Sequence, residues 1–147
     1  MFIDYMFTIL RYTPFLSPFI CMSCLSSKKG DQLAAVSTLI VMWCTEKMIK
    51  RQLAGVKAFM RPSKCTHKIF TDNVFSETCG FPSGHAAHAI FCASVVTSVF
   101  PHLWSLAFAV AFLCSFERVR MYCHTYTQCA AGMILGLCSF GLFSVIR

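Results

Sequence analysis

Apolar residues are gathered into five blocks along the 147-residue chain, and polar and charged residues lie between these blocks. The blocks cover about residues 7–25, 32–49, 83–100, 103–116 and 129–146. Most are long enough, as helices, to cross the hydrocarbon core of a bilayer. The block at 103–116 is shorter and would cross with tilt or local thinning of the bilayer. The pattern predicts an all-α protein, a multi-pass transmembrane helical bundle of about five spans, organised as a single domain over residues 1–147.

Prolines mark several of the predicted helix boundaries. Pro14 and Pro18 interrupt the first block, so we expect a kinked helix there. Pro82, followed by Ser83 and Gly84, is expected to begin the third helix, and Pro101 is expected to end it.

Two residue spacings predict helix contacts. Glu46 and Lys50 are four residues apart near the end of the second block, a spacing that allows an ion pair along one helix face. Gly132 and Gly136 form a Gly-x-x-x-Gly motif in the last block, and such a motif lets another helix approach closely.

The polar segments between the blocks converge on one side of the predicted bundle. With five spans, the segment 52–82 and the turn 117–127 fall on the same membrane face, whereas the turn 26–31 and residues 101–102 fall on the other. Ionisable residues are costly at membrane depth, so their convergence at one end of a bundle indicates a functional site.

Composition agrees with a membrane location. The chain is 56% hydrophobic and 13% charged, with a mean hydropathy of +0.63, which is too apolar for an ordinary soluble domain. The formal net charge of +7 includes an acid-free basic cluster at Lys50, Arg51, Lys57, Arg61, Lys64 and Lys68. Such a cluster would attract anionic lipid headgroups or hold a phosphate, or else form a positive-inside loop. Because the rest of the chain is lipid-like, nucleic acid is not an expected partner.

The ten cysteines are scattered rather than arranged as a disulfide framework. Most of those inside apolar blocks are expected to act as small hydrophobic residues. Cys21-x-x-Cys24 lacks a second ligand pair, so we predict no zinc site there. Cys65 and Cys79 flank a polar loop and would form a disulfide if that loop faced an oxidising lumen.

Four polar residues could together perform phosphoryl transfer. Such chemistry needs a nucleophile, an acid for the leaving oxygen and fixed positive charge around the phosphate. His124 and His85 can supply the first two, and the guanidinium groups of Arg61 and Arg118 can supply the third. The backbone N–H groups around Gly84 would open a helix N-terminus, which favours anions. Each residue alone is more often structural, as a hydrated histidine, a helix cap or a membrane anchor, so the prediction depends on their combination.

The order and spacing of these residues resemble the PAP2 (type-2 phosphatidic acid phosphatase) superfamily, whose pattern is K-x6-RP, then PSGH, then SR-x5-H-x3-D. Here the matching segments are residues 61–62, 82–85 and 118–124. The resemblance implies that His124 is a nucleophile forming a phosphohistidine and that His85 is the acid for the leaving group. It also implies phosphate ligands, which would be Arg61, Ser83, Gly84, Arg118 and a lysine. It implies no metal or other cofactor.

The chain departs from the pattern at three positions. Ala54 stands where the lysine is expected, and Lys50, one helical turn away, is favoured over Lys57 as its replacement. Glu117 replaces serine before Arg118 and would bring a negative charge close to the phosphate.

The third departure is Gln128 in place of aspartate. An aspartate would accept the Nδ1–H hydrogen bond of His124 and stabilise the imidazolium, whereas a glutamine oxygen accepts the same bond without a charge. His-x3-Gln is found in two branches of the superfamily, the dolichyl-diphosphatases and the glucose-6-phosphatases. Residues 118–128 are most similar to the dolichyl-diphosphatase branch, although the glycine of Pro-Ser-Gly-His resembles the other branch.

The resemblance implies hydrolysis of a polyprenyl (dolichyl) diphosphate to the monophosphate. The enzyme would lie in the endoplasmic reticulum membrane with a lumenal active site and would support N-glycosylation. Two alternatives remain open at this point. One is a broader lipid-phosphate phosphatase acting on phosphatidate or sphingoid phosphates. The other is a catalytically inactive scaffold that binds phospholipid.

Overall fold

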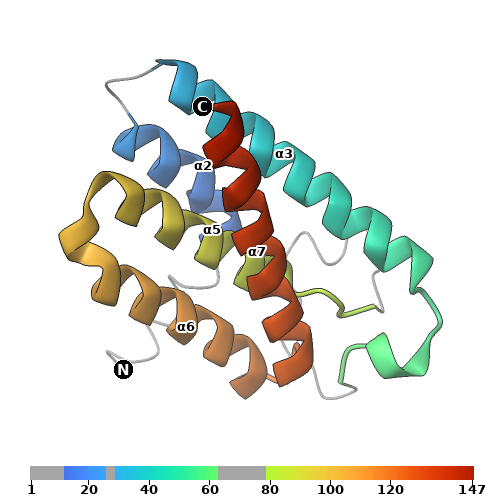
Figure 1. Ribbon diagram of the computed structural model, residues 1–147. Helices are drawn as coiled ribbons and strands as arrows, with labels where there is room; N and C mark the ends of the chain where they lie inside the picture. The colour runs from blue at the N-terminus through green and yellow to red at the C-terminus, as the bar shows by residue number, and fades with distance from the viewer. Residues whose placement is uncertain (1–11, 26–28, 63–78) are drawn as a thin grey trace.

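The computed structural model describes residues 12–25, 29–62 and 79–147, and these residues are largely helical (Figure 1). The helices are α2 (Thr13–Cys24), α3 (Lys29–Gln52), α5 (Gly84–Val99), α6 (Trp104–Arg120) and α7 (Tyr126–Ile146), with short 3₁₀ turns η1 (Lys57–Phe59) and η2 (Pro101–Leu103). Within the described residues there is no β-strand, and Met60 and Cys79 form an isolated bridge. The predicted all-α class is therefore confirmed for this part of the chain.

Several helix boundaries agree with the sequence prediction. α5 begins at Gly84 after Ser83, whose Oγ accepts a hydrogen bond from the Ala86 N–H at 3.5 Å, and ends at Val99 just before Pro101. α6 continues past the predicted end at residue 116 to Arg120. The last turns of α6 are polar, and neighbouring parts of the protein partly bury them. The helix therefore continues beyond the end of the apolar block.

The N-terminal helix is described only in part. The first apolar block begins at residue 7, but residues 1–11 lie outside the described part of the chain. α2 begins at Thr13 and continues through Pro18. A proline also lies in its first turn, where the missing N–H would have no partner within the helix in any case.

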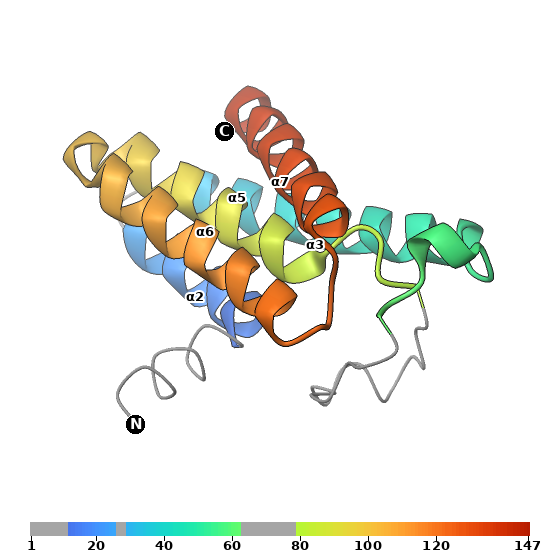
Figure 2. The ribbon, with the colours of Figure 1, turned by 90° about the horizontal axis from the view of Figure 1, so that it is seen from below.

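α5 is the central helix of the bundle and contacts α2, α3, α6 and α7 (Figures 1 and 2). α7 lies so close to α5 that a Cβ at Gly132 would collide with the carbonyl oxygen of Ser83. A Cβ at Gly136 would likewise collide with the carbonyl oxygen of Ala87. The close packing predicted from Gly-x-x-x-Gly is therefore confirmed, and α5 is the partner helix.

Two described helical segments, Pro101–Arg120 and Tyr126–Ile146, are long and apolar enough to cross a membrane. α5 is apolar but has only 16 residues, and α3 has 24 residues but carries charged residues near both ends. The larger number of about five spans therefore stays a prediction.

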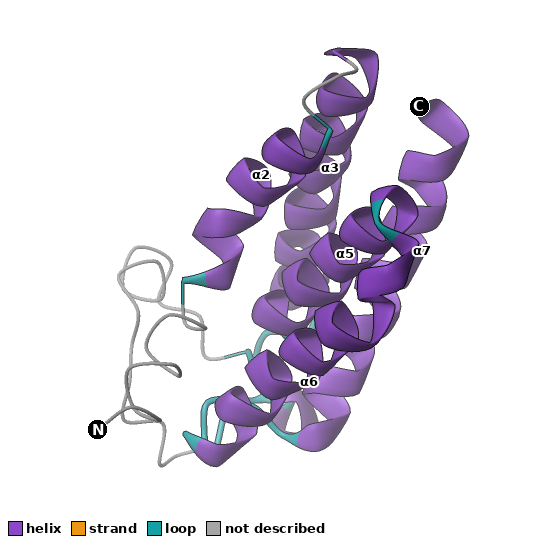
Figure 3. Ribbon diagram, turned by 90° about the vertical axis from the view of Figure 1, so that its left-hand side faces the viewer, coloured by secondary structure: helices purple, strands orange, loops and turns teal. Residues whose placement is uncertain are grey.

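The loops that carry the candidate chemistry gather at one end of the bundle, where α6 ends and α7 begins (Figure 3). The hydrogen bond from the Ser83 N–H to the Gln128 carbonyl oxygen, at 2.9 Å, joins the starts of α5 and α7 there. The expected convergence of the polar segments is thus present at the level of the backbone.

Candidate active site

His124 is held by the turn that ends α6. Tyr122 adopts a positive φ of 55°, its N–H bonds the Val119 carbonyl at 2.9 Å, and the Cys123 N–H bonds the Arg118 carbonyl at 3.0 Å. This is the Schellman arrangement that commonly closes a helix. The same Arg118 carbonyl also accepts the His124 N–H at 3.2 Å. The turn therefore fixes the backbone of His124, which is 2% exposed.

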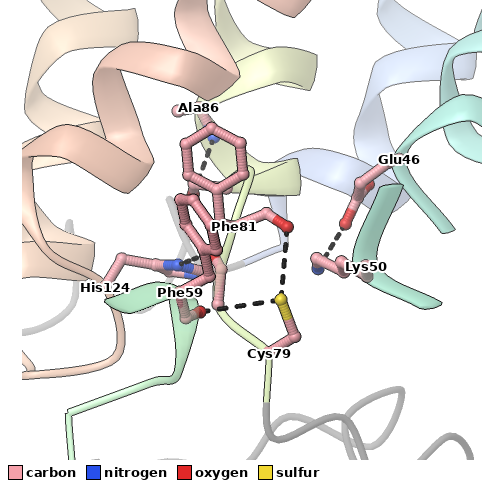
Figure 4. Close-up of polar contacts among 9 residues, drawn as sticks. Glu46, Lys50, Phe59, Cys79, Phe81, Ala86 and His124 are labelled. Atoms are coloured by element: carbon pink, nitrogen blue, oxygen red, sulfur yellow. Dashed lines mark hydrogen bonds and ion pairs between the residues drawn. The ribbon is translucent and has the colours of Figure 1, made fainter. Parts of the chain in front are cut away.

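The imidazole of His124 has a defined tautomer. Its Nδ1 lies 2.9 Å from the carbonyl oxygen of Gly80 (Figure 4). A carbonyl oxygen can only accept a hydrogen bond, so Nδ1 carries the hydrogen and, in the neutral ring, Nε2 keeps its lone pair. The atom needed for nucleophilic attack is therefore Nε2.

Burial and positive charge keep this imidazole neutral. Burial is the largest cause that holds the pKa of His124 well below its usual range, and the charges of Arg61, Arg118 and Lys50 lower it further. The bond to Gly80 acts weakly in the opposite direction. The three cations predicted as phosphate ligands therefore lie close enough to His124 to act on its charge.

Arg118 is buried in a way that suits an anion. It is 1% exposed, and Nε, Nη1 and Nη2 have no hydrogen-bond partner among the described residues. The carboxylate of Glu117, which is itself buried, comes no closer than 3.9 Å to Nη1. A buried guanidinium without hydrogen bonds is costly, so a phosphate that accepted them would be bound favourably.

Lys50 is buried beside the start of α5, and Lys57 is exposed. The Nζ of Lys50 lies 2.5 Å from Oε1 of Glu46, which confirms the predicted ion pair (Figure 4). The same carboxylate lies against Gly84, where an added Cβ would be 2.5 Å from Oε2. Glu46 therefore holds Lys50 at the helix start predicted to bind phosphate.

Ser83, Gly84 and His85 form that helix start, but their N–H groups are not equivalent. The Ser83 N–H donates to the carbonyl oxygen of Gln128, so the structure corrects the expectation that it is available to an anion. Gly84 and His85 are the first residues of α5, and the first N–H groups of a helix have no acceptor within it. His85 itself is half-buried.

Gln128 makes contacts that differ from the sequence interpretation. Its Oε1 accepts the Thr125 N–H at 3.1 Å, and Thr125 Oγ1 accepts the Gln128 N–H at 3.2 Å, which forms a capping box at the start of α7. Its Nε2 donates to the carbonyl oxygens of Met60 at 3.0 Å and Phe59 at 3.3 Å. The predicted bond from His124 Nδ1 to Gln128 is therefore replaced by the bond to Gly80.

Gly80 was not singled out from the sequence, although it contacts both residues. An added Cβ at Gly80 would lie 2.5 Å from Oε1 of Gln128, so the Gln128 amide packs on the residue that holds His124. The Thr125-x-x-Gln128 spacing is the only sequence signal for this arrangement, because it predicts the capping box.

Other candidates from the sequence have ordinary environments. His88, about one turn after His85 on α5, has its Nδ1 2.9 Å from Ser17 Oγ. Among the described residues, no group of three or more His, Cys, Asp or Glu side chains could hold a metal. Cys65 lies outside the described part of the chain. Cys79 is buried and free, and its sulfur donates to the carbonyl oxygens of Phe59 and Phe81 (Figure 4).

Two described helical segments are of membrane length, and His124 lies near three cations that could bind a phosphate. A family model described as the PAP2 superfamily matches residues 33–147, and the chain belongs to this superfamily. The match includes every candidate site residue and indicates a membrane protein that acts as a phosphatase of lipid phosphates. No curated protein and no solved structure matches the chain.

Proposed function

We propose that this phosphatase hydrolyses a polyprenyl diphosphate of the dolichyl type, releasing the lipid monophosphate and inorganic phosphate. The observation that carries the catalytic part is the neutral His124, with its Nε2 lone pair, beside the buried guanidinium of Arg118. The substrate class is supported by the similarity of residues 118–128 to the dolichyl-diphosphatase branch. By the same resemblance, the active site would face the lumen of the endoplasmic reticulum and support N-glycosylation.

In the first step, Nε2 of His124 attacks the terminal phosphorus and the bond to the bridging oxygen breaks. His85 protonates that oxygen as the lipid monophosphate leaves. In the second step, water attacks the phosphohistidine and gives a proton to His85, and the bond from Nε2 to phosphorus breaks. Inorganic phosphate is then released and the original imidazole is restored.

The cations would serve both the nucleophile and the transferring phosphoryl group. Arg118, Arg61 and Lys50 would bind the non-bridging oxygens, together with the first N–H groups of α5. Their charges lower the pKa of His124 and so keep Nε2 unprotonated before substrate binds. The Nδ1 bond to Gly80 orients the ring, and it strengthens when the phosphorylated imidazole becomes cationic.

The proposal is tested with purified protein in detergent and no added metal. Dolichyl diphosphate, phosphatidate and glucose 6-phosphate are offered separately, and release of inorganic phosphate is measured beside a His124→Ala control. We expect the highest kcat/KM for dolichyl diphosphate and a loss of at least about a thousandfold in the control. Phosphate release that survives His124→Ala would disprove the mechanism.

Residues 82–85 match the general superfamily pattern PSGH and not the dolichyl-diphosphatase version, which favours a second candidate, a broader lipid-phosphate phosphatase. A higher kcat/KM for phosphatidate would support that candidate. Lipid binding without phosphate release from any substrate would support the inactive scaffold instead.

A further inference from the structure

An apolar groove lies between α2, α5 and α6, next to the candidate active site. It has a volume of about 290 Å³. Its lining residues come from α2, α5, η2 and α6. α5 contacts both α2 and α6 (Figure 2). In the described part of the chain, the lining consists of aliphatic side chains and two cysteines, with no charged residue.

Small side chains line the inner part of the groove, where α5 packs against α6. Ala89 and Ala93 lie one turn apart on α5, and Ala107 and Ala111 lie one turn apart on α6. Residues four apart share one helix face, so two alanine stripes face the same space. Leu16, on α2, is one of the larger residues that line the groove.

The groove runs from the candidate active site toward the opposite end of the bundle. At one end, Ala89 is one helical turn after His85 and Cys114 is one turn before Arg118. At the other end, Leu103 lies at the turn between α5 and α6. From Leu103 to Cys114 the rise along a helix is about 16 Å. A molecule lying in the groove would therefore have one end at the phosphate-binding residues.

We propose that this groove binds the prenyl chain of the substrate, with the first prenyl units beside Ala89 and Cys114 and later units toward Leu103. The inference rests on the proposed function and adds the place where the lipid is recognised. A charged headgroup is excluded from the groove by the cost of burying charge among aliphatic side chains. A single chain along α5 and α6 places its diphosphate at Arg118 and His124.

The first test fills the groove and compares two diphosphates. Ala107→Trp places a large side chain on the lining, and Ala109→Trp is the matched control because Ala109 is exposed on the same helix and does not line the groove. Release of inorganic phosphate is measured from farnesyl diphosphate and from water-soluble isopentenyl diphosphate. We expect Ala107→Trp to lower kcat/KM for the farnesyl compound about tenfold and to change the isopentenyl value by less than about twofold. The control should change neither value.

Two kinetic outcomes would overturn the inference. An unchanged farnesyl value in Ala107→Trp would show that the chain lies elsewhere in the bilayer. An equal fall for both diphosphates would show that the substitution disturbs the fold or the catalytic residues and that the groove has no selective role.

The second test does not need catalysis, so it separates this inference from the proposed function. His124→Ala protein is irradiated with a farnesyl diphosphate that carries a diazirine on its last prenyl unit, and the cross-linked peptides are identified by mass spectrometry. We expect labels within residues 89–96 and 103–114. Labels confined to the outer faces of α3 or α7 would overturn the groove assignment, even if the protein hydrolyses the lipid. Labels in the groove without hydrolysis by the wild-type protein would support it and count against the proposed reaction.

Discussion

The carbonyl oxygen of Gly80 holds the Nδ1–H of His124 at 2.9 Å. This bond joins two segments that are 44 residues apart in the chain, and it fixes Nε2 as the atom with the free lone pair in the neutral ring. A backbone carbonyl therefore orients His124, whereas the family pattern has an aspartate for this role. The carbonyl provides direction without a negative charge.

This relationship makes Gly80 sensitive to a small change. In Gly80→Ala, the new Cβ would lie 2.5 Å from Oε1 of Gln128, so the backbone or the amide must move and the bond to His124 must change. We expect kcat/KM for a lipid phosphate to fall at least about tenfold, because small displacements of a catalytic group are costly. Gly30→Ala is the control, since no atom lies within 4 Å of its added Cβ. Equal kinetics for the two variants would contradict the positioning role of Gly80.

The pH dependence of the reaction should report the charges around His124. The neutral imidazole is the reactive form, and its pKa is held well below the usual range. As the pH falls past about 6.5, kcat/KM should therefore remain high, and it should decrease only at still lower pH. Lys50→Ala removes a positive charge that lowers this pKa. The pKa then rises, and the acidic limb of the profile should move to higher pH.

Lys57→Ala is the matched control for that experiment, because Lys57 is exposed and is not among the groups that lower the pKa of His124. We expect Lys50→Ala to weaken substrate use more than Lys57→Ala and to be the only one of the two that shifts the acidic limb. The reverse order would assign the phosphate-binding lysine to position 57.

Gln128 should be sensitive to loss of its amide hydrogens. Gln128→Glu keeps the size of the side chain but replaces the amide nitrogen with a carboxylate oxygen. This oxygen cannot donate to the carbonyl oxygens of Met60 and Phe59, so the backbone leading to Arg61 should shift. We expect kcat/KM to fall about a hundredfold and the affinity for orthovanadate, a phosphate analogue, to fall with it. Gln128→Leu should also lose most activity.

Gln128→Asp separates the two interpretations of this residue. If position 128 serves only to accept a hydrogen bond from His124, aspartate should preserve activity. If the contacts in the structure matter, the shorter acceptor cannot donate to Met60, and activity should fall as in Gln128→Glu. Full activity in Gln128→Asp would therefore exclude the second interpretation.

The α5–α7 contact gives a stability prediction. Gly136→Ala should lower the midpoint of thermal unfolding in detergent, because its Cβ would collide with the carbonyl oxygen of Ala87. Gly141→Ala on the same helix has no atom within 4 Å of the added Cβ. This substitution should raise the midpoint slightly, because alanine favours the helical conformation over glycine by about 1 kcal/mol. A Gly136→Ala protein as stable as the control would show that the helices separate without cost.

The sequence by itself determined features that depend on neighbouring residues or on composition. The start of α5 after Ser83, the Glu46–Lys50 pair and the small face at Gly132 and Gly136 all follow from short spacings along one helix. The order of the site motifs also identified the superfamily, which the match over residues 33–147 confirms. The number of spans does not follow in this way, because neither α3 nor α5 is both apolar and long.

Only the tertiary structure decided which groups pair across the site. Gly80 and Gln128 both offer oxygen acceptors, and the sequence does not reveal which of them takes the Nδ1–H of His124. The Gln128 oxygen already accepts the Thr125 N–H, and its amide nitrogen is bound by the loop at Met60. The outcome depends on how chain segments far apart in the sequence pack together, because the single Nδ1–H of His124 donates to the acceptor that the fold brings within reach, the carbonyl oxygen of Gly80. Residue type supplied the chemistry, and packing around α5 selected the partners.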